Sequence, residues 1–179
     1  MRVSDSLRRW PLRGVVLVGV VIACLVGSGA ALATDSYHRV PVGNTPFDVG
    51  PQVCGFPIHV GIVSDKEYFT HQTTLADGTL IQQVNGKLVV SLTNVSTGKT
   101  IVTNESGPGT FTSYPDGSFL FDGQGHSFNF FGPIGQANTG EPGLVLTSGH
   151  VVVHFSGVTG AADSFTLHGT QTNGCALLS

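Results

Sequence analysis

The chain has 179 residues, of which 40% are apolar and only 11% are charged, and its formal net charge is −3. Without the 33 residues of an N-terminal export signal, the remainder carries four basic and ten acidic side chains, a net charge of −6. That length suits one domain with its own core. The negative charge argues against nucleic-acid binding, which needs a basic face for phosphate.

Residues 1–33 have the organisation of a signal peptide. Four arginines precede an apolar run over residues 15–26, and Ala31-Leu32-Ala33 matches a small-residue cleavage pattern. Cleavage after Ala33 predicts a secreted protein that meets the membrane only through its export signal. Three alternatives stay open: a retained anchor over residues 14–33, a twin-arginine signal at Arg8-Arg9, and lipidation of Cys24.

The next segment, residues 34–53, is predicted to form an extended arm, because Pro41, Pro46 and Pro51 interrupt any regular element. From residue 54 to 179, Gly-centred turn signals recur at nearly even intervals between runs rich in Val, Ile, Thr, Leu and Phe. No helical period extends over eleven residues. The expected strands are 56–64, 67–75, 79–84, 87–94, 99–105, 109–114, 118–122, 127–131, 144–147, 151–156 and 164–169.

Asn85-Gly86 is the strongest turn signal, because both residues tolerate the positive φ that a type I′ hairpin requires. A two-residue loop there pairs the flanking strands and sets Val84 opposite Lys87.

Two further connections follow from the same reasoning. Asp77-Gly78 predicts a two-residue loop between Ala76 and Thr79. Residues 132–143, with Pro133 and Pro142, are expected to be the longest loop and the site of mobility or binding.

A third hairpin is predicted at Gln124-Gly125, because its two-residue loop brings several aromatic side chains onto one buried face. On that face Phe121→Ala is expected to cost about 3–5 kcal/mol. Phe131 is expected on the opposite face, less buried. The four rings on the shared face are either plain core or the lining of a cavity for an apolar ligand; they are Phe119, Phe121, Phe128 and Phe130.

Two cysteines remain after cleavage, and an even pair in an exported chain predicts a disulfide between Cys54 and Cys175. This bond would tie the first strand of the domain to the last. Consecutive hairpins with joined ends predict an all-β fold, an antiparallel meander that closes into a small barrel. Its size is similar to that of lipocalin-like or allene-oxide-cyclase-like barrels, and a β-sandwich is the alternative.

Histidines give no metal motif. His150 and His154 have the spacing of a helical zinc pair, but three valines separate them, so the segment is a strand and the two lie about 13 Å apart. His71, His126 and His168 are isolated in sequence. We therefore predict no metal and no cofactor.

Catalytic signatures are equally sparse. There is no G-x-S-x-G and no reactive-cysteine context. A pair of carboxylates for the acid–base catalysis of glycoside hydrolysis would come from Glu67, Asp122, Glu141 or Asp163. No spacing in the sequence brings two of them together.

Four motifs in the chain are Cys54-Gly55-Phe56, the stretch from Leu92 to Lys99, the stretch from Glu105 to Gly109, and Asp116-Gly117-Ser118. Together they resemble uncharacterised small secreted β-rich proteins of high-GC Gram-positive bacteria. The resemblance implies a bacterial secreted protein and carries no activity and no site residues. We expect a non-catalytic domain that binds a small apolar molecule or a surface partner; a secreted enzyme of isomerase or cyclase type is the alternative.

Overall fold

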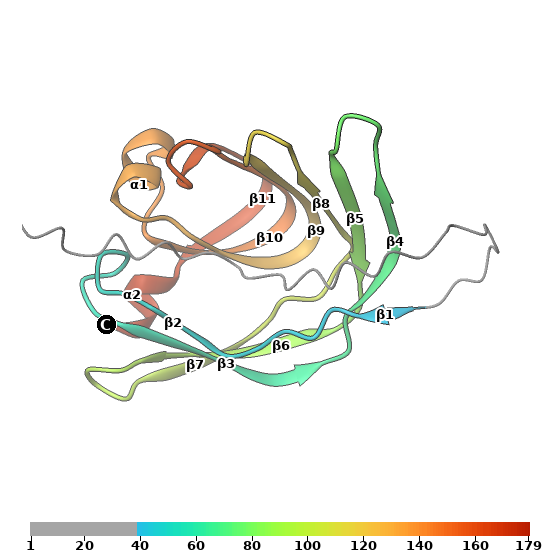
Figure 1. Ribbon diagram of the computed structural model, residues 1–179. Coiled ribbons are helices and arrows are strands. Elements are labelled where there is room, and N and C mark those ends of the chain that lie inside the picture. The colour runs from blue at the N-terminus through green and yellow to red at the C-terminus, as the bar shows by residue number, and fades with distance from the viewer. Residues whose placement is uncertain (1–38) are drawn as a thin grey trace, which may run out of the picture. The chain divides into compact units, whose positions relative to one another are not determined.

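The computed structural model describes residues 39–179, which form two antiparallel β-sheets (Figure 1). One sheet has seven strands in the order β1-β4-β5-β8-β9-β10-β11, and the other has four in the order β2-β3-β6-β7. The all-β prediction is confirmed, and the strand pairings within residues 39–179 give two separate sheets with no closed ring. The predicted signal peptide, its expected cleavage site, Cys24 and the start of the predicted arm lie outside the described residues.

Eleven strands and two short helices make up this part of the chain. No helix within residues 39–179 has the length and apolarity to cross a membrane. The strands are β1 (Val40–Pro41), β2 (Phe47–Val49), β3 (Ile58–Asp65), β4 (Tyr68–Thr74), β5 (Leu80–Asn85), β6 (Leu88–Asn94), β7 (Thr100–Asn104), β8 (Gly109–Ser113), β9 (Phe119–Phe130), β10 (Leu144–Phe155) and β11 (Ala162–Asn173). The helices are α1 (Pro133–Thr139) and α2 (Gly174–Leu178).

The chain passes between the sheets at the connections that follow β1, β3, β5 and β7. The connections after β3 and β5 lie side by side, since Lys66 N–H donates to Lys87 O at 2.8 Å. The predicted hairpin at Asn85-Gly86 is wrong: β5 pairs with β4 and β8, whereas β6 pairs with β3 and β7. Gly86 has the expected positive φ of 138°, but it serves a crossing, where a Cβ would lie 2.3 Å from Lys66 O.

Asp77-Gly78 does form a hairpin, between β4 and β5, with a loop one residue longer than predicted. Leu75 N–H donates to Thr79 O at 2.8 Å, and Gly78 adopts φ 89°. The loop therefore contains Ala76, Asp77 and Gly78, an arrangement that places glycine at the left-handed position.

Gln124-Gly125 is not a turn, which corrects the predicted aromatic hairpin. Residues 118–122 and 127–131, predicted as two strands, belong largely to the single twelve-residue strand β9, which pairs with β10 along its whole length. β10 likewise replaces two predicted strands. Gly125 lies opposite Gly149, and Gly149 lies opposite Gly169, so a row of glycines crosses β9, β10 and β11.

The three long strands bend strongly at this glycine row. Phe121 and Phe165 both pair with Val153, so they stand in one row across the sheet. Phe131 comes ten residues after Phe121, about 33 Å along a straight strand. Yet the rings of Phe131 and Phe165 are 5.5 Å apart. The sheet therefore curls back on itself, as the arcs of β9 to β11 show in Figure 1.

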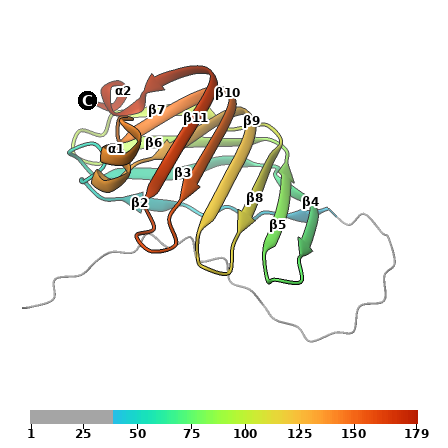
Figure 2. The same ribbon diagram turned by 90° about the horizontal axis from the view of Figure 1, so that it is seen from above.

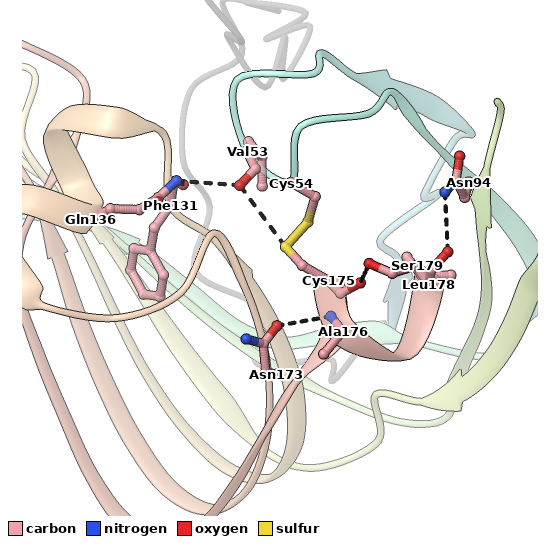
Figure 3. The surroundings of a disulfide bond; sticks show 10 residues. All are labelled: Val53, Cys54, Asn94, Phe131, Gln136, Asn173, Cys175, Ala176, Leu178 and Ser179. Atoms are coloured by element: carbon pink, nitrogen blue, oxygen red, sulfur yellow. Dashed lines mark hydrogen bonds between the residues drawn. A yellow bond between two sulfur atoms is a disulfide. The ribbon is translucent and has the colours of Figure 1, made fainter. Parts of the chain in front are cut away.

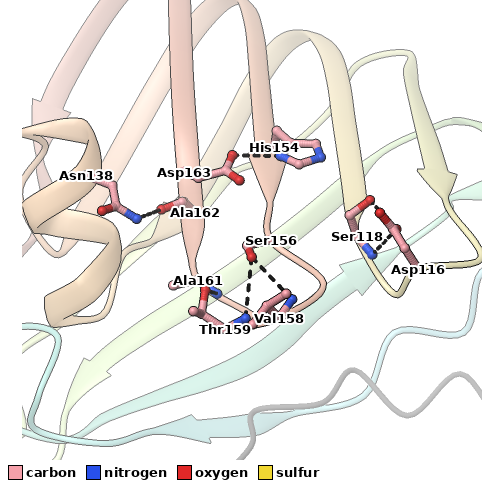
Figure 4. Close-up of polar contacts among 10 residues, drawn as sticks. All are labelled: Asp116, Ser118, Asn138, His154, Ser156, Val158, Thr159, Ala161, Ala162 and Asp163. Atoms are coloured by element: carbon pink, nitrogen blue, oxygen red, sulfur yellow. Dashed lines mark hydrogen bonds and ion pairs between the residues drawn. The ribbon is translucent and has the colours of Figure 1, made fainter.

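Helix α1 lies beside the start of β11, within residues 132–143 that were predicted to be a loop (Figure 2). Asn138 Nδ2 donates to Ala162 O at 3.0 Å (Figure 4), and Gly135 is buried against Phe131 and Ala162. A helix at this place covers part of an edge strand that would otherwise offer free backbone groups.

The buried side chains form two clusters. One fills the space above the four-stranded sheet and includes Ile58, Val60, Val90, Leu92 and Leu144, with Phe128 and Phe130 packed against it. The other lies within the curled strands and includes Phe131, Val145, Val151, Val153 and Ala162, with Phe121 and Phe155 against it.

The disulfide between Cys54 and Cys175 is confirmed (Figure 3), with a Cα–Cα distance of 5.3 Å. It joins the segment between β2 and β3 to α2, just after the last strand. Helix α2 is fixed twice more: Asn173 caps its first turn through Ala176 N–H, and Asn94 Nδ2 donates to Leu178 O at 3.0 Å.

We expect Gly149→Ala to destabilise the protein by about 1–3 kcal/mol, the range for backbone strain at positive φ in a residue other than glycine. Gly149 has φ 131°, and an added Cβ would lie 2.4 Å from His168 O. Gly132→Ala is the control, because no atom lies within 4 Å of its Cβ position and its φ is −68°. Urea midpoints of the two variants test this; equal midpoints would contradict the requirement for glycine at the bend.

Candidate functional site

Four phenylalanines from three strands gather on the concave face of the seven-stranded sheet. Their ring centroids are 5.0 Å apart for Phe111 and Phe121, 5.7 Å for Phe111 and Phe119, and 5.9 Å for Phe119 and Phe155. All four side chains are half-buried. We call this set the aromatic face. It is apolar, partly open to solvent and held by strands, so its geometry is fixed without a ligand.

The four predicted ligand-binding residues are divided between two places. Phe119 and Phe121 belong to the aromatic face, whereas Phe128 and Phe130 pack against each other at 5.3 Å in the cluster over the four-stranded sheet. The division follows from β9 being continuous: odd and even positions of one strand point to opposite faces. Phe111 and Phe155 were not among the predicted residues; the pairing of β8 and β10 with β9 brings them to the aromatic face.

A second cluster consists of carboxylates at the sheet crossings. We call Asp65, Glu67 and Glu105 the acidic corner. Asn44, from the arm, joins two of them: its Nδ2 donates to Glu67 Oε2 at 3.0 Å and to Asp65 Oδ2 at 3.3 Å. Burial raises the pKa of Glu67, the hydrogen bond from Asn44 lowers it, and the charge of Asp65 raises it.

Glu105 is the unusual member of the acidic corner. Its side chain is 8% exposed, and neither carboxylate oxygen has a hydrogen-bond partner within residues 39–179. Burial raises the pKa of Glu105 from 4.5 to about 7. Of the two smaller influences, the Thr103 side chain lowers this pKa and the charge of Glu67 raises it. A carboxyl group of this kind changes protonation near neutral pH, which suits acid–base chemistry.

Glu67 was a predicted candidate, whereas Glu105 was not. The signal was present, because Glu105 follows Ile101 and Thr103 at alternate positions, the inward-facing side of β7. Its neighbour Glu67 is 38 residues away in the chain, so only the two crossings bring them together.

We expect Glu105→Gln to remove a pH dependence of stability. The carboxyl has the higher pKa in the folded state, so the folded state holds the proton more tightly and loses relative stability as pH rises from 4.5 to about 7. A difference of this size is worth about 3 kcal/mol, which an uncharged glutamine does not lose.

Urea unfolding at pH 4.5 and pH 8 measures this effect. The wild-type midpoint should fall more than that of Glu105→Gln across this range. Glu141→Gln is the control and should behave like the wild type. The carboxylate of Glu141 accepts a hydrogen bond from Gln171 at 2.9 Å at the surface. If Glu105→Gln and the wild type change in parallel, Glu105 does not carry the proton.

The histidines of β10 are held by separate carboxylates. His150 Nε2 lies 2.8 Å from Asp122 Oδ1, and His154 Nδ1 lies 2.6 Å from Asp163 Oδ1 (Figure 4). The ring of His150 also stacks on that of His168 at 6.1 Å. In the described part of the chain, no group of three or more His, Cys, Asp or Glu side chains is placed to hold a metal ion.

Comparisons with known proteins give no match: no family model, no curated protein and no solved structure is similar to this chain. The function must therefore be argued from the site itself.

Proposed function

We propose that the mature chain is an exported, non-catalytic binding module that holds a small, flat, apolar ligand on its aromatic face. The half-exposed stack of Phe111, Phe119, Phe121 and Phe155 is the observation that supports it. An exposed apolar cluster of this kind is costly unless it is used, and aromatic rings bind other planar groups by stacking. Strands hold the rings in place, which lowers the ordering cost of binding.

The architecture proposed with this function is that of an incomplete small barrel, similar to lipocalin-like or allene-oxide-cyclase-like barrels, with a β-sandwich as the alternative. The curl of β9, β10 and β11 supports the barrel-like arrangement, since it turns the concave face of the long sheet inward. The two-sheet pairing supports the sandwich.

Fluorescence titration with anilinonaphthalene sulfonate, a flat apolar probe, tests the proposal. Saturable binding is expected, and Phe111→Leu should weaken it by about tenfold, since an aromatic pair is worth roughly 0.5–1.5 kcal/mol beyond its burial. Phe128→Leu is the control, because Phe128 packs in the other cluster. Absence of saturable binding, or equal loss in both variants, would reject the aromatic face as the binding site.

A secreted enzyme of isomerase or cyclase type is the second candidate, and Glu105 is the observation that favours it. Its buried, unpartnered carboxyl group, with Glu67 nearby, could move a proton to and from a bound apolar substrate. A ligand that co-purifies with the wild type should then be recovered as a mixture of isomers. From Glu105→Gln the ligand should be recovered unconverted but still bound. Identical mixtures from the wild type and the variant would reject the enzyme and leave only the binding module as a candidate.

Export is proposed on the sequence, and the disulfide is compatible with it. N-terminal sequencing of protein from the culture medium should find Thr34 first. A cell-bound protein that begins earlier would favour the anchor, and a lipid-modified Cys24 would favour the lipoprotein alternative.

A further inference from the structure

The face of the seven-stranded sheet that lies opposite the aromatic face has a polar hollow with a volume of about 310 Å³. Its side chains come from β4, β5, β8 and β9, and next to it the backbone of Pro108 and Gly109 enters β8. The volume lies at the lower end of the range for small-ligand sites. The polar side chains that line it are Thr70, Gln83, Asn85, Thr110, Asp122 and Gln124.

The hollow lies on the face away from the aromatic face. Gln83 pairs with Thr110, and Thr110 pairs with Asp122, so these three side chains form one row across β5, β8 and β9. The adjacent row, from Gln82 through Phe111 to Phe121, points to the concave side. Neighbouring groups in such a row are about 5 Å apart.

Most of the hydrogen-bonding capacity in the hollow is unused. The side chains of Gln83, Thr110 and Gln124 form no hydrogen bond with any other residue in the described part of the chain, residues 39–179. Asn85 uses its Oδ1 for Gly86 N–H at 2.8 Å, which leaves its amino group free. Asp122 uses Oδ1 for His150 at 2.8 Å, which leaves Oδ2 free.

This chemistry excludes several kinds of ligand. The lining offers amides, hydroxyls and one carboxylate, so an apolar molecule would leave polar groups unpaired. It holds no lysine or arginine, and Asp122 repels anions. A single carboxylate shared with an imidazole is too few oxygen donors for a metal ion. What remains is a neutral molecule that carries several hydroxyl groups.

We propose that this hollow binds a neutral sugar ring. Each amide supplies a donor and an acceptor, and a hydroxyl group needs both. The free Oδ2 of Asp122 accepts from one sugar hydroxyl, while Gln83 and Gln124 bind others from either side. The ring of Pro108 supplies an apolar surface against which the C–H groups of a sugar ring can lie. The site is separate from the aromatic face, so it is independent of the proposed function.

The test is an NMR titration of the full mature protein with glucose, galactose and N-acetylglucosamine. At least one sugar should shift the side-chain amide signals of Gln83, Asn85 and Gln124 saturably. Cyclohexanol, a ring of similar size with one hydroxyl, and a sugar phosphate should bind at least about tenfold more weakly, the change expected for a lost hydrogen bond or an added repulsion.

Variants complete the test. Gln83→Ala and Asp122→Asn should each weaken sugar binding by about tenfold. Gln171→Ala is the control, because Gln171 is on β11 and donates to Glu141. The signals of the unaltered protein decide the question if a variant fails to fold. Absence of saturable shifts with all three sugars, stronger binding of the sugar phosphate, or an equal loss in Gln171→Ala would overturn the proposal.

Discussion

Replacing Phe131 with alanine should lower the free energy of unfolding by about 3–5 kcal/mol, the cost of truncating a fully buried phenylalanine. Phe131 is 1% exposed and packs edge-on against Phe165 at 5.5 Å. It also lies against Gly135 of α1, so its ring is enclosed by the curled strands and the helix. Truncation would open a cavity at the place where the curl closes.

Phe121→Ala is the matched comparison, and it should cost less than Phe131→Ala. Phe121 is half-buried on the aromatic face, so less surface returns to water when the ring is removed. This order is the reverse of the one that the sequence predicted. Urea midpoints of both variants decide it: a larger loss for Phe121→Ala would mean that the ring of Phe131 does not close the curl.

Removing the disulfide should have an effect of similar size. In the chain-entropy account, a bond between residues 121 positions apart lowers the conformational entropy of the unfolded chain. This stabilises the folded state by about 4–5 kcal/mol. The double variant Cys54→Ser with Cys175→Ser leaves no lone thiol, and its urea midpoint should fall by a corresponding amount. The released C-terminal helix should also become more sensitive to protease, because Cys175 lies in α2.

A control separates the bond from its surroundings. Asn94→Ala removes the hydrogen bond to Leu178 O and leaves the disulfide intact, so it should loosen α2 with a smaller loss of about 1–3 kcal/mol. If the double serine variant keeps the wild-type midpoint, the bond does not restrict the unfolded chain, and the entropic account fails for this protein.

The candidate sites were only partly accessible to sequence reasoning. The sequence pointed to phenylalanines as ligand contacts, but it grouped them through a hairpin that β9 does not have. Glu105 was not named as a candidate; the sequence placed it only at the end of a predicted strand, residues 99–105. Its burial depends on which residues cover it, and these come from distant parts of the chain. The polar hollow needs four strands in register, and register is decided by the whole sheet.

The sequence by itself determined the all-β class and most of the separate strands, because period-2 runs and glycine-centred turns are local signals. It also determined the cysteine pair, since only Cys54 and Cys175 follow the predicted signal peptide. The tertiary structure alone decided what the glycines do. Gly78 closes a hairpin, Gly86 carries the chain from one sheet to the other, and Gly125 lets a long strand bend, yet all three have positive φ. The local sequence specifies which backbone angles a glycine can adopt. The packing of the two sheets and the burial of Phe131 decide whether that glycine forms a hairpin, a crossing or a bend.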